Sequence, residues 1–211
     1  MMLVGVLWAI FAPLGLLIIA GLIATALRRF GRWIAIAAAS IVTLVPVALL
    51  WSGDHAEFSS VCAQTRAKIS STGKADGILL NSETANSFGT RYIYDEGFSW
   101  FEARDIYNRE KWVRYQREPD GRITSHPVVT PEAHYEVRET YARPFTHTGL
   151  TVVSVIDRTN GVELGHAGNA QFDGGRAKWL LGAWGSSQCP SGMLDPEGFR
   201  AFYHLAHDTL R

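Results

Sequence analysis

Four side chains between positions 102 and 186 have the types that hydrolases use, namely Glu102, Asp105, His134 and Ser186. A pair of carboxyl groups can cleave a glycosidic bond, and a serine activated by a histidine can cleave an amide. Ser186 does not lie in the Gly-x-Ser-x-Gly turn that exposes the nucleophile of α/β-hydrolases. A membrane-tethered hydrolase acting on peptidoglycan or peptide is therefore an alternative that requires these groups to meet in a cleft.

The histidines give little support for a metal site. His204 and His207 are three residues apart, so on one helix they would share a side. A zinc site needs further ligands, and Asp208 is not on the same stripe of that helix. We therefore expect no metal and no cofactor, and we interpret these histidines as solvated helix residues.

The segment 91–117 is rich in the residue types that dominate protein interfaces, because it interleaves Tyr, Trp and Phe with five arginines. Such side chains combine a large buried area with directed polar contacts. The same composition also suits a sheet whose aromatic residues form the core, and only alternate residues of a strand face outward. Both interpretations remain open at this point. The candidate interface residues are Arg91, Tyr92, Tyr94, Trp100, Arg104, Tyr107, Trp112 and Arg114.

Two cysteines, Cys62 and Cys189, are the only ones in the chain. Neither belongs to a Cys-x-x-Cys pair, which disfavours redox catalysis and zinc binding. In an oxidising compartment two such residues are expected to form a disulfide, and the alternative is a pair of buried free thiols. A bridge that closes so long a loop would stabilise the domain by up to about 5 kcal/mol.

Residues 1–53 have the composition of a membrane anchor, since they contain no Asp, Glu, Lys or His. Their charged side chains are Arg28, Arg29 and Arg32. The apolar runs 3–27 and 33–51 are each long enough to cross a hydrocarbon core of about 30 Å as a helix. They predict a two-helix transmembrane hairpin with its turn at 28–32. No ionisable group lies within either run, so we interpret the hairpin as an anchor and not as a channel.

The position of the arginines predicts the orientation of the chain. Loops rich in arginine near transmembrane ends stay in the cytoplasm, so both termini and the domain 54–211 are expected on the periplasmic side of an inner membrane. Removing the three arginines from 20 basic residues leaves 17 against 20 acidic residues in that domain, a formal charge of −3. This balance disfavours binding to nucleic acid.

The elements of the domain 54–211 follow from its local patterns. Apolar spacing predicts a helix over 55–69 that begins with a capping box at Asp54 and Glu57, and Asp195-Pro196-Glu197 begins a closing helix that runs to about 210. A turn at 157–161 joins two strands. The predicted strands are 78–80, 91–94, 98–101, 112–116, 135–141, 150–156, 162–172 and 178–183. The predicted fold is α+β, an antiparallel sheet with helices at both ends of the domain.

These observations favour an anchored envelope protein whose disulfide-linked domain acts as a non-catalytic binding module. The expected partners are the lipid bilayer and an envelope or membrane protein. Besides the tethered hydrolase, a second alternative is a small accessory subunit whose hairpin packs within a larger membrane complex through its alanine-rich faces.

Overall fold

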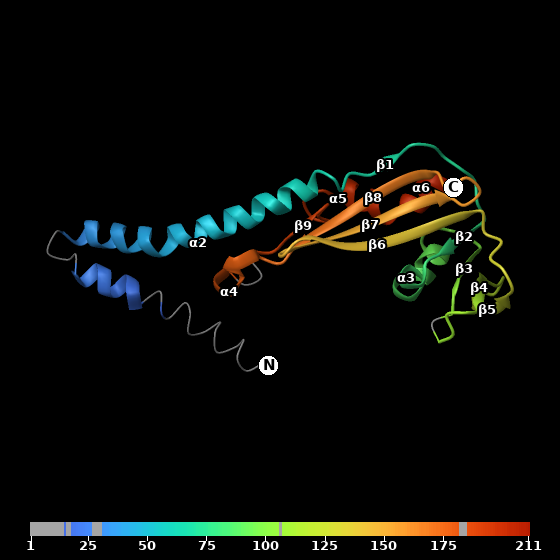
Figure 1. Ribbon diagram of the computed structural model, residues 1–211, viewed down its shortest axis with the longest axis horizontal. Coiled ribbons are helices and arrows are strands. Elements are labelled where there is room, and N and C mark those ends of the chain that lie inside the picture. Colours follow the sequence, from blue (N-terminus) through green and yellow to red (C-terminus); the bar gives the residue numbers. More distant parts are fainter. Residues whose placement is uncertain (1–14, 16–17, 27–30, 106, 182–184) are drawn as a thin grey trace. The chain divides into compact units, whose positions relative to one another are not determined.

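A computed structural model describes residues 15, 18–26, 31–105, 107–181 and 185–211 (Figure 1). The described residues form two compact units. The first, which we call the anchor unit, contains the chain up to Val61 together with Arg143–Gly149 and Gln171–Gln188. The second, the sheet unit, contains the remaining residues.

In the anchor unit, helix α2 (Arg32–Cys62) is the element that is long and apolar enough to cross a membrane among the described residues. It includes the whole predicted span 33–51 and continues without a break past Asp54. The predicted capping box is therefore wrong, because Asp54 lies inside the helix and its carboxylate binds Arg176. The helix also ends at Cys62, well before the predicted end at 69.

The first predicted span, 3–27, lies largely outside the described residues. Residues 18–26 are helical, and most of the arginine-containing turn 28–32 also lies outside the described part of the chain. A two-helix hairpin therefore stays a prediction.

A nine-stranded sheet, with helices packed against it, makes the fold α+β as expected. Its path runs β1-β8-β7-β6-β2-β3-β4-β5, and β9 pairs with β8. The strands are β1 (Lys68–Ile69), β2 (Gly77–Leu80), β3 (Trp100–Arg104), β4 (Trp112–Arg117), β5 (Ile123–Val128), β6 (Tyr135–Phe145), β7 (Thr148–Asp157), β8 (Glu163–Phe172) and β9 (Ser187–Cys189). The sheet is mixed, which corrects the predicted antiparallel sheet, because β2 runs parallel to both β3 and β6.

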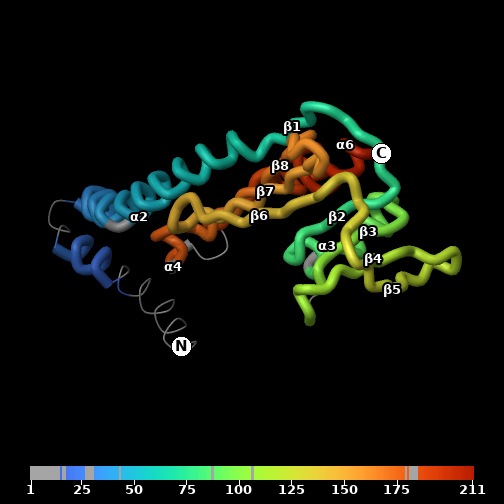
Figure 2. The backbone as a smooth tube through the Cα atoms, turned by 45° about the vertical axis from the view of Figure 1, so that its right-hand side comes forward, coloured from blue at the N-terminus to red at the C-terminus, as the bar shows by residue number. Residues whose placement is uncertain are grey.

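The parallel pairing depends on helix α3 (Ser82–Tyr94), which connects β2 to β3 beside those strands (Figures 1 and 2). Asn81 caps the helix by accepting a hydrogen bond from the backbone N–H of Thr84. Gly89 lets the helix approach Phe101 on β3, since a Cβ at this position would lie 2.8 Å from that ring. The predicted strand 91–94 is therefore wrong, and its β-prone residues form the last turn of a helix.

Two short segments near the carboxyl end also differ from the prediction. The run 178–183 forms a helix, α4 (Lys178–Leu181), over its described part, and it follows the 3-10 helix η2 (Gly175–Ala177). The closing helix is divided at His204 into α5 (Pro196–Tyr203) and α6 (Leu205–Leu210). Asp195 caps α5 as predicted, because its side chain accepts from the N–H of Gly198.

The turn between β7 and β8 is confirmed. The Asp157 N–H donates to the Val162 carbonyl, and Gly161 has a positive φ of 69°. The core of the sheet unit is built from the sheet, α3 and α6. Its buried members are Ile78, Leu80, Tyr92, Ile93, Phe98, Phe101, Ala103, Val137, Val153, Val155, Leu164, Ala167, Leu205, Ala206 and Leu210.

Candidate interaction surface

The antiparallel pairing of β3 with β4 brings several arginines and tryptophans onto one face of the sheet. In this register Trp100 lies opposite Gln116, Glu102 opposite Arg114, and Arg104 opposite Trp112. Because side chains alternate along a strand, these six residues share a face, while Phe101 and its stacked neighbour Tyr115 occupy the other. The sequence segment thus supplies both a core face and an outward face.

Glu102 is the buried residue that links the side chains on this face. Its buried carboxylate accepts hydrogen bonds from Arg114 Nε at 3.1 Å and Nη2 at 2.7 Å through Oε1. Through Oε2 it accepts from the backbone N–H groups of Glu132 at 2.8 Å and Ala133 at 2.9 Å. One carboxylate therefore fixes both the guanidinium on β4 and the chain that leaves β5.

Arg114 is held from two sides. Besides Glu102, its Nη2 donates to Glu132 Oε2 at 2.6 Å. Hydrogen bonds to Glu132 and Glu102 raise the pKa of Arg114 above its ordinary value, so the group stays charged. Its guanidinium carbon lies 4.4 Å from the centre of a Trp100 ring, within the range of a cation–π interaction.

A second stack of the same kind lies at the far end of the two strands. The guanidinium carbon of Arg104 is 3.9 Å from the centre of a Trp112 ring, and Nη1 donates to the Glu110 carbonyl at 2.8 Å. Both side chains are half-buried, so their remaining surface stays accessible.

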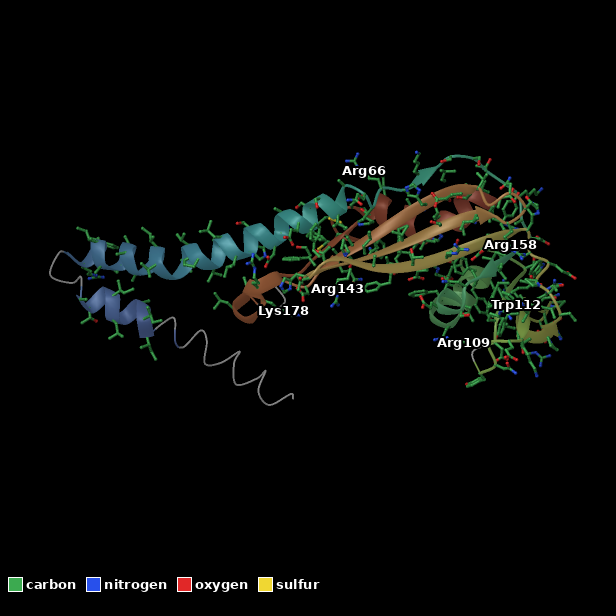
Figure 3. The ribbon with its side chains drawn as sticks, viewed as in Figure 1. Arg66, Arg109, Trp112, Arg143, Arg158 and Lys178 are labelled. Carbon is green, nitrogen blue, oxygen red and sulfur yellow. A yellow bond between two sulfur atoms is a disulfide. The ribbon has the colours of Figure 1, made fainter. Side chains whose placement is uncertain are left out.

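Two exposed apolar residues flank this second stack. Tyr107 in the β3–β4 loop and Val129, which follows β5, are each 94% exposed. Val128 is the β5 partner of Trp112, so Val129 leaves the sheet beside that tryptophan. Figure 3 labels Trp112 on β4 and Arg109 in the neighbouring loop. We call Arg104, Tyr107, Trp112 and Val129 the Trp112 end of the sheet.

The loop that carries Tyr107 is ordered by Asp105. Its Oδ1 accepts from the backbone N–H groups of Tyr107 at 2.7 Å and Asn108 at 2.9 Å. Asp105 therefore has a local structural role, since an Asx-type turn of this kind fixes the course of a loop.

The other predicted interface residues lie elsewhere in the sheet unit. Tyr92 is buried in the core, and Arg91 donates to Glu96 and to the Tyr203 carbonyl. Tyr94 is exposed at the end of α3, where its hydroxyl donates to the Gly121 carbonyl at 3.2 Å. Val129 and Glu132 carry no signal in the sequence, because neither belongs to the arginine-rich segment and only the pairing of β4 with β5 brings them near it.

The candidate catalytic groups have separate partners. Glu102 is enclosed in its ion-pair network, Asp105 orders a loop, and His134 Nε2 lies 3.4 Å from Asp157 Oδ1. Ser186 belongs to the anchor unit, whereas the other three belong to the sheet unit.

The two histidines considered for a metal also have different environments. His204 lies at the junction of α5 and α6, and the ring of His207 on α6 contacts the Glu96 carbonyl at 3.0 Å. The described residues contain no group of three or more His, Cys, Asp or Glu that could hold a metal ion.

Glu96 is a second buried carboxyl group in the sheet unit. Arg91 Nη2 lies 3.0 Å from Oε1, and the N–H of His207 donates to Oε2 at 3.0 Å. Burial raises the pKa of Glu96 to about 7, although both donors favour the charged form. This group lies beneath α6 and ties the end of α3 to the carboxyl-terminal helix.

Cys62 and Cys189 form the expected disulfide, with their Cα atoms 5.8 Å apart. It joins residues separated by 127 positions and lies within the sheet unit. An open pocket of about 540 Å³ adjoins the bridge and is lined in part by Arg66, Asp195 and Glu197. Charges of both signs line this pocket, so it has no simple preference for an anion or a cation.

Comparison of the chain with protein-family models, with curated protein sequences and with solved structures finds no match.

Proposed function

We propose that the protein is a membrane-anchored, non-catalytic binding module that captures an envelope or membrane protein at the Trp112 end of its sheet. The observation that carries this proposal is the Arg104–Trp112 stack, flanked by two apolar side chains that are almost fully exposed. Tryptophan, tyrosine and arginine contribute most of the energy of typical protein interfaces.

The internal hydrogen bonds of this face favour binding because they order the side chains before a partner arrives. Binding normally costs about 0.5–1.5 kcal/mol for each flexible side chain that becomes fixed. Arg104 is already held by the Glu110 carbonyl and by the Trp112 ring. Tyr107 belongs to a loop whose course is fixed by hydrogen bonds to Asp105. These contacts lower the entropic cost of association.

The charges around the stack indicate the chemistry of the partner. Arg104, Arg109 and Lys111 supply three cations against two carboxylates, Asp105 and Glu110. The Asp105 carboxylate already accepts from backbone N–H groups of its own loop, so the net charge here is positive. A partner that places an apolar side chain between Tyr107 and Val129, with a carboxylate beside it, would complement this surface.

Anchoring in an inner membrane supports the same proposal. Helix α2 is long and apolar enough to serve as a span, and Arg32 at its start, with Arg28 and Arg29, favours a cytoplasmic position for that end. The sheet unit would then face the periplasm, where the Cys62–Cys189 disulfide is stable.

Site-specific photo-cross-linking in native membranes tests the proposal. A photoreactive phenylalanine derivative replaces Tyr107 or, separately, Val129 in the full chain. We expect each variant to form a discrete protein adduct, and Trp112→Ala in the same chain to remove that adduct.

The matched control replaces Tyr141 on β6, a tyrosine that is also exposed, at 62%. It should not form the adduct. Equal labelling from Tyr141, or adducts that survive Trp112→Ala, would show that the Trp112 end is not the binding surface.

A further inference from the structure

The anchor unit contains a second surface, formed by α4 and the turn between β6 and β7, which is separate from the Trp112 end of the sheet. We propose that α4 and the turn between β6 and β7 rest on the membrane, with Leu180 and Phe145 in the lipid interface beside Trp51. This inference rests on the proposed anchoring of the chain through α2. The occupant is the headgroup and upper acyl region of a phospholipid bilayer.

Trp51 marks the depth of the interface. It ends the apolar run of α2, and the first acidic residue, Asp54, follows three positions later. An indole at the end of a span prefers the headgroup level, where its ring is buried and its N–H finds an acceptor. Here the acceptor is protein, because Trp51 Nε1 donates to the Gly185 carbonyl at 3.3 Å.

This hydrogen bond brings a distant part of the chain to the same depth. Gly185 lies four residues after Leu181, the last residue of α4. Four residues span at most about 14 Å, so the end of α4 lies within that distance of Gly185.

A second contact fixes the other end of the segment. The N–H of Arg176 donates to Asp54 Oδ2 at 2.7 Å, and its Nη2 lies 2.9 Å from Oδ1. Asp54 is three residues beyond Trp51 on the helix, which places it about 4.5 Å farther from the span. Helix α4 lies between these two attachment points along the chain, so it lies at the membrane surface.

The turn between β6 and β7 joins α4 through Asp173. The ring of His147 lies 3.1 Å from Asp173 Oδ1, and Lys178 Nζ lies 3.5 Å from Oδ2. Phe145, the last residue of β6 before this turn, remains exposed although it is aromatic. Figure 3 shows Arg143 and Lys178 in this part of the anchor unit.

The charges of the anchor unit beyond the apolar run indicate whether the contact depends on the charge of the lipid. Beyond the apolar run, the described residues of the anchor unit carry equal numbers of acidic and basic side chains. The acids are Asp54, Glu57 and Asp173, and the bases are Arg143, Arg176 and Lys178. Balanced charge gives little net attraction to an anionic membrane, so the contact should depend on apolar insertion and not on lipid charge.

Spin labelling of the full chain in lipid nanodiscs tests the inference. Nitroxide is attached to Leu180→Cys or Phe145→Cys, with the native disulfide left oxidised. Reference labels are placed at Leu49→Cys, on the exposed apolar side of α2, and at Arg122→Cys, in a charged turn. Accessibility to oxygen, which concentrates in lipid, is compared with accessibility to a water-soluble nickel chelate.

We expect the ratios at Leu180 and Phe145 to lie between those of the two reference labels. The ratios should be the same in phosphatidylcholine alone and in phosphatidylcholine mixed with phosphatidylglycerol. Two results at Leu180 and Phe145 would overturn the inference: ratios equal to that of Arg122, or lipid access only in the anionic mixture. If Leu49 is exposed to lipid in the same experiment, the anchoring through α2 still stands. A water-exposed label at Leu49 would overturn the anchoring itself.

Discussion

Glu102 and Arg114 face each other across the β3–β4 ladder, and two N–H groups of the guanidinium donate to the same oxygen of a fully buried carboxylate. The other carboxylate oxygen accepts from the chain between β5 and β6. Arg114 is also a member of the stack on Trp100, so this pair links that stack to the chain that follows β5.

Removing one member of this pair should destabilise the sheet unit strongly. Glu102→Ala would leave two backbone N–H groups and part of a guanidinium without acceptors, at a cost of about 3 kcal/mol. Urea unfolding followed by tryptophan fluorescence measures this loss. The control is Arg122→Ala, whose pair with Asp120 is exposed to solvent and should contribute little to stability. Equal effects of the two variants would show that burial of Glu102 is not important.

Gly77 should be essential for the position of Trp100. These residues are register partners in β2 and β3, and a Cβ at position 77 would lie 2.1 Å from the indole. We expect Gly77→Ala to displace Trp100, to destabilise the domain by about 1–3 kcal/mol and to shift tryptophan emission.

Gly53 provides the matched control for that substitution. It lies inside α2, where an added Cβ would meet only the flexible end of Arg176 at 3.7 Å. Gly53→Ala should leave the fold unchanged or stabilise the helix by up to about 1 kcal/mol. A Gly77→Ala variant as stable as the Gly53→Ala variant would contradict the predicted clash.

Glu96 should make stability depend on pH. Its pKa is 4.5 in the reference state and about 7 in the folded protein, so between these values the folded state binds more protons than the unfolded state. The free energy of unfolding should therefore fall as pH rises through this window, by an amount on the order of 1 to 3 kcal/mol.

Urea unfolding at about pH 5 and about pH 8 measures this dependence. Glu96→Gln should flatten this dependence, and the difference between the two profiles measures the contribution of the Glu96 carboxyl group. Parallel profiles for the two proteins would refute the assignment.

Loss of the disulfide should weaken the fold without altering its topology. Cys62→Ser combined with Cys189→Ser removes a bridge between residues 127 positions apart, which would cost about 3–5 kcal/mol. Thermal unfolding in the presence and absence of a reductant measures this cost. The reductant should lower the midpoint of the native chain but not that of the double variant, and a fall in both would point to another cause.

The features that sequence predicted well are those that depend on local chemistry. Asp195 before Pro196 predicts a capped helix, and the Asn-Gly turn at 157–161 predicts a hairpin, because each pattern satisfies its own backbone groups. The disulfide was predictable because the chain has two cysteines and both were expected in an oxidising compartment.

The features that sequence missed depend on contacts between distant residues. Residues 91–94 are β-prone, yet α3 extends over them because Asn81 caps it and Gly89 lets it pack on Phe101. Asp54 has the position of a capping residue, but Arg176, far along the chain, provides its partner. The candidate surface was predicted in part, since the arginine–tryptophan stacks arise from one short hairpin, whereas Val129 reaches them only through β5.

The most direct test of the account is the affinity of the full chain for the protein captured at Tyr107. Trp112→Ala should weaken that affinity by about 30-fold, which corresponds to about 2 kcal/mol for a central interface residue. Val129→Asp, at a position that contributes little to the fold, should also weaken it, and Tyr141→Ala should have no effect. Unchanged affinity in both the Trp112→Ala and Val129→Asp variants would contradict the proposal that the Trp112 end of the sheet is the binding surface.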